Sequence, residues 1–233
     1  MQEPLRETIR KVILVLLEAS RKTLFIENEY IKSKTNFASE VIIGVLKQLA
    51  EKELIILEAG GVIVPSRINL VEEALRYGIP VDKASLYLDW RDFEQLSSRY
   101  LEAHGYRVYR GIRLPPPRGF EIDVLGLGPR YTIVVDCKHW SPGYSKKWKL
   151  KKAAQEHLER TQRLAKRLWL VARRYGEELR RAKTLIPVIV TLTDPGLRYH
   201  EGVLISPITL FNNLLLNIDV VVEELGVGIK TEL

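Results

Sequence analysis

The sequence contains very little sulfur. Its 233 residues include one cysteine, Cys137, and one methionine. A single cysteine excludes an internal disulfide, so we expect the chain to work in a reducing cytoplasm. The four histidines, His104, His139, His157 and His200, are scattered along the chain. With one cysteine they do not form the clusters that hold zinc.

Long apolar runs are also missing. No stretch approaches the roughly 20 apolar residues that cross a bilayer. The N-terminal segment MQEPLRETIR mixes acids with bases and lacks the layout of a signal peptide. Hydrophobic residues make up 46% of the chain and charged residues 28%, which is typical of a folded globular protein. We therefore expect no membrane partner, and a chain long enough for two modest domains or one large one.

Positive charge is concentrated in one segment. Residues 146–183 contain 14 Lys or Arg and 4 acids, whereas residues 1–80 contain 11 of each kind. Positive charge gathered on one element is typical of a surface that binds phosphate backbones, although solvated helix faces show it too. The basic side chains that we expect to contact nucleic acid are Lys146, Lys147, Lys149, Lys151, Lys152, Arg160, Arg163 and Arg167.

The first 80 residues predict three helices followed by a hairpin. Apolar residues recur with helical spacing near residues 9–17 and 41–49, a shorter helix fits around residues 27–32, and Gly60 and Gly61 separate two β-rich runs. This order resembles a winged helix-turn-helix module, which implies a domain of residues 1–80. Because the segment has no net charge, two roles stay open: DNA binding through the helix near residues 39–52, or dimerisation.

Helix-stop residues cluster at residues 78–83 and predict a boundary there, with a second domain of residues 81–233. A helix capped by Asp89 and closed by Gly105 opens this domain. Three strands follow at residues 106–114, 120–127 and 131–140, then a long basic helix at about 149–181. A strand at 185–193, a short strand at 202–205 and a helix at 207–217 complete the pattern. The order predicts an α/β fold with a mixed central sheet flanked by helices.

Charged side chains interrupt two of these otherwise apolar strands. In YTIVVDCKHW, the alternation of a strand puts Asp136 and Lys138 on the same face. In GFEIDVLGLG, Asp123 lies between apolar neighbours. A short turn joins the two strands, so we expect them to pair antiparallel with Asp123 and Asp136 at similar depth. Buried strands seldom hold such charges without a reason, although a structural ion pair between Asp123 and Lys138 is the simpler alternative.

Two converging carboxylates favour a hard cation such as Mg²⁺, for which Mn²⁺ would substitute. Such a cation lowers the pKa of a bound water and neutralises charge on a phosphate. Lys138 would then orient the attacking water. His139 follows the site by one residue and points to the opposite face, so we expect it to be structural.

Three segments together, WRDFEQLSSRYLEAHGYRVYRG, GFEIDVLG and YTIVVDCKHW, resemble the PD-(D/E)XK nuclease superfamily, and most closely its Mrr-type restriction endonuclease branch. The resemblance spans about residues 88–217 and implies a restriction-endonuclease-like fold. Many relatives have Glu where Asp136 stands, so Asp136 keeps the charge but has a shorter reach. The residues that the resemblance implies are the metal-handling acids Glu94, Asp123 and Asp136, the catalytic Lys138, and Gln155 as the glutamine that some branches place on the next helix.

These features predict a Mg²⁺-dependent deoxyribonuclease, an endonuclease that hydrolyses phosphodiester bonds in double-stranded or branched DNA. Nucleases of this fold often cut as dimers, so we expect a homodimer. Two alternatives remain: a non-catalytic DNA-binding or regulatory protein that uses the nuclease fold as a scaffold, and a nuclease similar to Holliday-junction resolvases. The same charge pattern also fits RNA.

Overall fold

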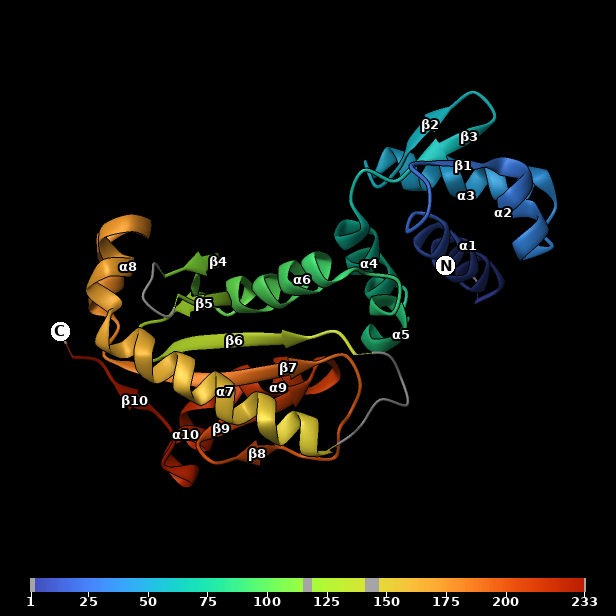
Figure 1. Cartoon of the computed structure of the whole chain (residues 1–233). Coiled ribbons are helices and arrows are strands. Elements are labelled where there is room, and N and C mark those ends of the chain that lie inside the picture. Colours follow the sequence, from blue (N-terminus) through green and yellow to red (C-terminus); the bar gives the residue numbers. More distant parts are fainter. Residues whose placement is uncertain (1–2, 115–118, 141–146, 233) are drawn as a thin grey trace. The chain divides into compact units, whose positions relative to one another are not determined.

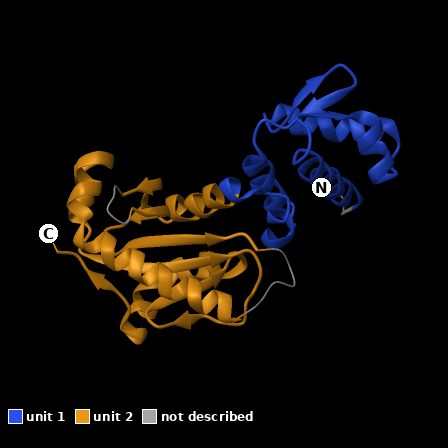
Figure 2. Cartoon of the chain, in the orientation of Figure 1, with its two compact units in different colours: residues 1–92 blue, residues 93–233 orange. Residues whose placement is uncertain are grey.

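The computed structural model describes residues 3–114, 119–140 and 147–232. The chain divides into two compact units, Met1–Asp92 and Phe93–Leu233 (Figure 2). The expected boundary between residues 80 and 81 stays a prediction. Within the described residues, no helix has both the length and the apolar character needed to span a membrane.

The first unit contains the helices and the hairpin that the sequence predicts. Its sheet has the strand order β1-β3-β2, and the hairpin turns at Gly60, whose φ of +82° favours glycine. Apolar residues from α1 and α3 fill the core, among them Ile13, Leu16 and Leu49. The assignment of this unit as a winged helix stays a prediction. Its elements are α1 Glu3–Ala19, β1 Phe25–Glu27, α2 Asn28–Thr35, α3 Ser39–Glu51, β2 Ile56–Glu58, β3 Gly61–Ile63, α4 Arg67–Arg76 and α5 Val81–Ser85.

Helix α6, Trp90–Ala103, begins in the first unit and continues into the second. The predicted cap at Asp89 is confirmed, because its carboxylate accepts a hydrogen bond from the backbone N–H of Asp92 at 2.9 Å. In turn, the Asp92 carboxylate accepts a hydrogen bond from the backbone N–H of Asp89 at 3.3 Å. The two acids thus satisfy N–H groups that a helix start leaves without partners.

The second unit is built on a mixed sheet with the order β4-β5-β6-β7-β9-β8, and β10 pairs with β7 (Figure 1). The pairs β4–β5 and β5–β6 are antiparallel, whereas β6–β7 and β7–β9 are parallel. This is the mixed α/β sheet that the sequence predicts. The strands are β4 Arg107–Arg113, β5 Glu121–Leu127, β6 Thr132–Lys138, β7 Thr184–Thr191, β8 Tyr199–His200, β9 Val203–Pro207 and β10 Ile229–Lys230.

The long basic helix expected at about residues 149–181 is wrong as one element. The chain forms α7 Lys147–Lys166, α8 Leu168–Tyr175 and the 3-10 helix η1 Glu177–Arg181. Arg167 leaves the helical conformation with φ −121° and ψ 16°, and Gly176 has a φ of +151° that suits glycine. Beyond the predicted helix at α9, Ile208–Leu216, a further helix α10, Ile218–Leu225, precedes β10.

Apolar side chains hold α7 and α8 against the sheet. Every residue of β7 is buried, as expected for a central strand with parallel neighbours on both sides. Helix α7, yellow in Figure 1, contacts β7 and β9. The core between helix and sheet includes Leu125 and Val134 from the strands and Leu164 and Leu168 from the helices. Since Val134 and Asp136 alternate along β6 toward the same side, this packing also fixes the side on which Asp136 lies.

Candidate active site

The candidate site lies where strands β5 and β6 diverge. Their antiparallel ladder ends at the pair Val124–Val135, and the next position in the same register would place Asp123 opposite Asp136. There the backbone N–H of Cys137 donates to Asp123 Oδ2 at 2.7 Å instead of to a strand carbonyl. The antiparallel pairing and equal depth expected from the sequence are therefore present, and the two acids share one face of the sheet.

Two cations neutralise the Asp136 carboxylate. Asp136 is 4% exposed. Its Oδ1 accepts a hydrogen bond from an Nη of Arg160 on α7 at 2.6 Å. Its Oδ2 lies 2.7 Å from Lys138 Nζ, close enough for an ion pair. The angles of this second contact do not meet those of a hydrogen bond, so Oδ2 has no aligned donor among the residues that the structure describes.

Alternation along β6 separates this carboxylate cluster from a second set of contacts. Cys137 points the other way, and its Sγ lies 3.4 Å from Ser97 Oγ on α6. His139 stacks edge-on against Phe93 of the same helix, with ring centroids 5.3 Å apart. The expectation that His139 turns away from the carboxylates is confirmed. The face of β6 toward α7 thus holds the charges, and the face toward α6 is mostly packed.

The two carboxylates influence each other. Burial, and after it the negative charge of Asp136, raise the pKa of Asp123 to about 6. The Cys137 N–H and the cations Lys138 and Arg160 act in the opposite direction without cancelling the shift. An acid beside a second buried acid is a common feature of functional sites, because one proton or one cation stabilises both.

His157 lies one turn before Arg160 on the buried face of α7. Its Nε2 is 2.9 Å from the carbonyl oxygen of Val134. Burial lowers the pKa of His157 to about 4, against the opposing effects of Asp136 and the Val134 carbonyl. The ring is therefore neutral at pH 7 and donates through Nε2, while Nδ1 has no partner in the described chain. The positive charge next to the two acids comes from Lys138 and Arg160.

Two further residues predicted for the site, Glu94 and Gln155, lie on helices α6 and α7. Glu94 is half-buried on α6. Burial is the largest cause of the raised pKa of the Cys137 thiol, and the negative charges of Asp123, Asp136 and Glu94 raise this pKa as well. Gln155 is exposed on α7, and its amide donates to Glu201 Oε2 at 3.1 Å. The structure thus brings Asp123, Asp136 and Lys138 together, whereas the roles of Glu94 and Gln155 stay predictions.

The oxygen ligands at this site would complete only part of the coordination shell of a divalent cation. Asp123 and Asp136 face each other, and Asp136 Oδ2 is buried without an aligned donor. Among the described residues, no three His, Cys, Asp or Glu side chains gather as a metal-binding group. A cation here would have two protein carboxylates and would take its other ligands from water and phosphate, as Mg²⁺ commonly does.

The basic residues of α7 form two groups. Lys147, Lys151 and Lys152 are exposed, and Lys149 is half-exposed near the Trp148 ring. By contrast, Arg160 is turned inward to Asp136, Arg163 lies 4.7 Å above the ring of Phe120, and Arg167 marks the break before α8. Lys146 lies outside the described residues.

Arg160 and His157 lie at the site, although the sequence pattern does not place them there. By charge alone, Arg160 is expected among the cations that follow a phosphate backbone. A signal was available, because Ala153, His157, Thr161 and Leu164 recur with helical spacing and define the buried face of α7. Arg160 lies on the edge of that face and is therefore directed to the sheet.

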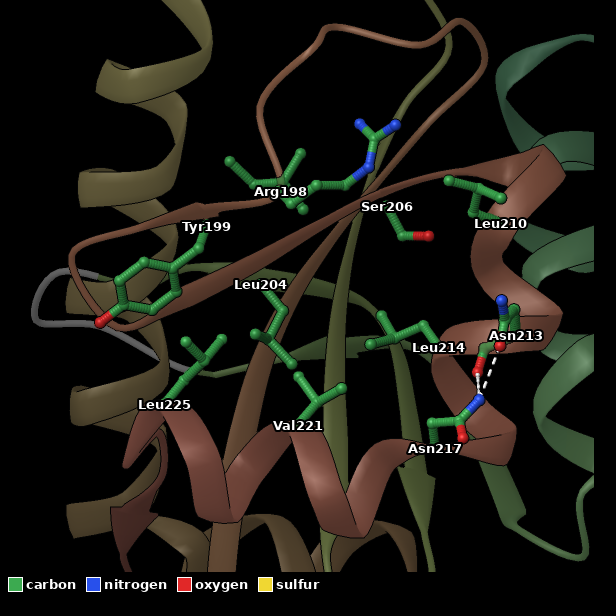
Figure 3. Close-up of a pocket in the computed structure, with 11 residues that line it drawn as sticks. Arg198, Tyr199, Leu204, Ser206, Leu210, Asn213, Leu214, Asn217, Val221 and Leu225 are labelled. Carbon is green, nitrogen blue, oxygen red and sulfur yellow. Dashed lines mark hydrogen bonds between the residues drawn. The ribbon is translucent and has the colours of Figure 1, made fainter.

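One surface hollow lies away from the carboxylate site. It encloses about 510 Å³ between β8, β9, α9 and α10 (Figure 3). Its walls are mainly apolar, with Leu204, Leu214, Val221 and Leu225 among them, and it contains none of the predicted site residues. We place the function at the carboxylates because they offer the reactive groups, whereas this hollow offers mainly packing surface.

A mixed central sheet flanked by helices is compatible with a nuclease fold. Residues 89–192 match the family of the Nuclease-related domain (NERD), a PD-(D/E)XK-like nuclease family. The match includes Glu94, Asp123, Asp136, Lys138 and Arg160.

Two further similarities were found. An Archaeoglobus fulgidus protein, described only as an uncharacterized protein, is 30% identical over 140 residues, which cover 59% of this chain and 97% of the relative. The crystal structure of protein VC1899 from Vibrio cholerae matches 94% of this chain with 11% identity and a TM-score of 0.36. The chain spans 56% of the length of that structure. This second match supports no inference about fold or activity.

Proposed function

We propose that the chain is a metal-dependent DNA endonuclease that hydrolyses phosphodiester bonds. The observation that supports this most strongly is the placement of Asp123 opposite Asp136 at the end of the β5–β6 ladder, with Lys138 Nζ 2.7 Å from Asp136. A nuclease-related domain over the same residues supports the reaction class. The Mrr-type branch, the winged helix of residues 1–80 and a homodimer belong to the proposal as well.

Asp123 and Asp136 would hold Mg²⁺ or Mn²⁺, and Glu94 would contribute from α6 directly or through water. When bound, the cation supplies a water of lowered pKa and neutralises charge on the scissile phosphate. Asp123 is suited to this role because its raised pKa of about 6 reflects a carboxylate that gains from a nearby positive charge.

Lys138 and Arg160 are the groups of the chain that would act on the phosphate. Both are paired with Asp136. Once that carboxylate is otherwise neutralised, both side chains can turn toward the phosphate oxygens and stabilise the charge that develops there. Lys138 can also orient the attacking water. Neutral His157 keeps α7 in register with β6 through Val134 and adds no charge.

Nucleic acid would be bound by the exposed lysines Lys147, Lys151 and Lys152, with Lys149 beside them. Such contacts set affinity and position without selecting a sequence. Their number predicts a steep loss of affinity with added salt.

A second candidate function is that of a DNA-binding protein without catalysis. Both oxygens of Asp136 are engaged by cations of the same chain, as in a structural ion-pair network. In that case Asp123, Asp136 and Lys138 would only hold β5, β6 and α7 together, and the exposed lysines would keep their role.

A cleavage assay separates the two candidates. Purified protein is incubated with supercoiled, linear, single-stranded and branched DNA and with RNA, in Mg²⁺, Mn²⁺ or EDTA. We expect metal-dependent nicking of DNA that Asp136→Ala or Lys138→Ala abolishes while binding persists. Asp194→Ala and Lys183→Ala, which remove the same charges from exposed positions of the same unit, serve as controls.

The outcomes are distinct. Cutting by the two site variants at the wild-type rate would overturn the active-site assignment. Binding without cleavage of any substrate in either metal would favour the second candidate. Cleavage of RNA alone would keep the site and change the substrate class.

A further inference from the structure

A second basic site lies on α8 and β4, apart from the carboxylates and the lysines of α7. Here the chain encloses a hollow of about 320 Å³. This is within the size range of pockets that bind small ligands. Its lining combines three arginines, a tyrosine and aliphatic side chains: Arg113, Leu114, Leu170, Val171, Arg173, Arg174 and Tyr175.

The floor of this hollow is apolar. Leu114 is 5% exposed and belongs to the core between the sheet and the helices, together with Val171. Leu170 is half-buried beside them. A floor of this kind accepts the flat face of an aromatic ring more readily than a hydrated ion, because covering it removes apolar surface from water.

The rim of the hollow is basic and partly fixed. The backbone N–H of Arg113 donates to the Tyr175 hydroxyl at 3.0 Å, and Arg113 Nε pairs with Glu121 at 3.1 Å. The guanidinium of Arg174 lies 5.4 Å from the ring centre of Tyr175. Arg173 is exposed, and no acidic side chain in the described parts of the chain pairs with Arg173 or Arg174. Guanidinium groups in such a position are suited to bidentate contacts with phosphate.

Helix α8 adds an aromatic side chain next to this rim. Trp169 is 46% exposed and precedes Arg173 by four residues, so the two lie on the same side of the helix. Exposed aromatic rings beside arginines bind unpaired bases by stacking.

We propose that this hollow binds one unpaired nucleotide of a DNA strand, with the phosphate at Arg173 and Arg174 and the base over the apolar floor. The choice of DNA rests on the proposed function. A base within a duplex is stacked between its neighbours and cannot lie flat on this floor, so the site would favour substrates with a single-stranded tail over blunt duplexes. A free phosphate would use the arginines alone and leave the apolar floor uncovered.

The site is also separate from the carboxylates along the helices. Arg173 follows Arg160 by 13 residues. Because the helix breaks at Arg167 between them, Arg160 and Arg173 lie on different helices, α7 and α8.

Fluorescence anisotropy of the full chain in EDTA tests the proposal without cleavage. The probes are a labelled 20-base-pair blunt duplex and the same duplex with a ten-thymidine tail. We expect wild type to bind the tailed probe at least tenfold more tightly. The double variant Arg173→Gln/Arg174→Gln should lose this preference, whereas Arg180→Gln/Arg181→Gln, with the same loss of charge on η1, should keep it.

Two single variants test the contributions of the Trp169 ring and the Tyr175 hydroxyl one at a time. Trp169→Ala and Tyr175→Phe, which leave the charge unchanged, should each reduce the preference for the tail by about threefold or more. Thermal unfolding of every variant checks that the fold is retained.

Competition distinguishes a nucleotide from an anion. Thymidine monophosphate should displace the tail at a concentration at which inorganic phosphate does not. Equal displacement by phosphate would overturn the assignment of a nucleotide.

Further results would overturn the proposal. Equal binding of tailed and blunt probes by wild type would do so, and so would equal losses in the pocket and control doubles. Failure of this site and failure of the proposed function are distinguishable. Asp136→Ala should keep the tail preference, and the pocket double should keep metal-dependent nicking of supercoiled DNA.

Discussion

Helix α7 presents cations of two kinds, and their comparison is instructive. Lys147, Lys151 and Lys152 extend from its first two turns into solvent, where water screens them. Arg160, two turns further on, is 24% exposed in its side chain and contacts Asp136, whose side chain is 5% exposed. The net charge of the segment counts both kinds equally. Their energetic roles differ, because the same charge is worth far more beside a buried carboxylate than in water.

The largest expected difference concerns stability. Arg160→Ala would leave Asp136 buried with Lys138 as its remaining partner, and removal of one partner of a buried pair is strongly destabilising. Allowing for partial exposure, we expect a loss of about 2–3 kcal/mol in the free energy of unfolding. Urea unfolding in EDTA at pH 7 measures it.

Lys151→Ala is the matched control, since it removes one cation from an exposed position of the same helix. Its expected cost is below about 0.5 kcal/mol. In an Asp136→Asn background, the cost of Arg160→Ala should fall by half or more. Equal costs for Arg160→Ala and Lys151→Ala would remove the distinction between the two kinds of cation.

The second difference concerns nucleic-acid affinity, to which we expect the exposed lysines to contribute more than Arg160. If Lys147, Lys151 and Lys152 each neutralise one phosphate, their joint replacement by Gln lowers the slope of log K against log salt by about 2.7. We expect about a tenfold or greater loss of duplex binding at low salt with unchanged thermal stability. Anisotropy titrations at several salt concentrations in EDTA measure both quantities. A slope lowered by about 0.9 in Arg160→Ala alone, the share of one phosphate, would contradict the inward role of that residue.

A third prediction concerns the raised pKa of Asp123 and its effect on stability as the pH changes. The folded-state pKa of Asp123, about 6, lies above the ordinary value of 3.8, because burial and Asp136 disfavour its charge. The stability gained from its protonation is fully present below about pH 4 and is lost as the pH rises through 6. Asp123→Asn stays neutral and can still accept from Cys137 N–H.

We therefore expect Asp123→Asn to become more stable relative to wild type between pH 4 and pH 8, by about 2 kcal/mol. Unfolding in EDTA across this range measures the difference. A difference that does not change with pH would show that the pKa of Asp123 is not raised in the folded protein.

The smallest effect is expected on the opposite face of β6. Cys137→Ala removes the Sγ contact with Ser97 but keeps the backbone N–H that holds Asp123. We expect a cost of about 1 kcal/mol and cleavage within threefold of wild type. A loss of cleavage as large as that of Lys138→Ala would mean that the face toward α6 takes part in the reaction.

Local pattern was sufficient to predict the centre of the site. Side chains alternate along a strand, so Asp136 and Lys138 had to share a face. The short turn after β5 brought Asp123 level with Asp136. The mixed sheet followed from the order of helices and strands for the same reason: each pattern depends on neighbours in the sequence.

Contacts between residues far apart in the sequence could not be predicted in the same way. The inward turn of Arg160 depends on how α7 lies across β6, which no local pattern specifies. The break at Arg167 also lacks a local signal, because arginine is a good helix former. Gln155 illustrates the same point: helical spacing places it on the exposed side, but its partner Glu201 is 46 residues away.

The most direct measurement is a crystal structure of the protein soaked in Mn²⁺ with a phosphate-containing oligonucleotide, with the ion located by anomalous scattering. We expect an anomalous peak about 2.1 Å from carboxylate oxygens of both Asp123 and Asp136, with Lys138 turned toward a phosphate oxygen. A peak elsewhere, or Asp136 still held by Arg160 and Lys138 with no ion in the presence of excess Mn²⁺, would contradict it.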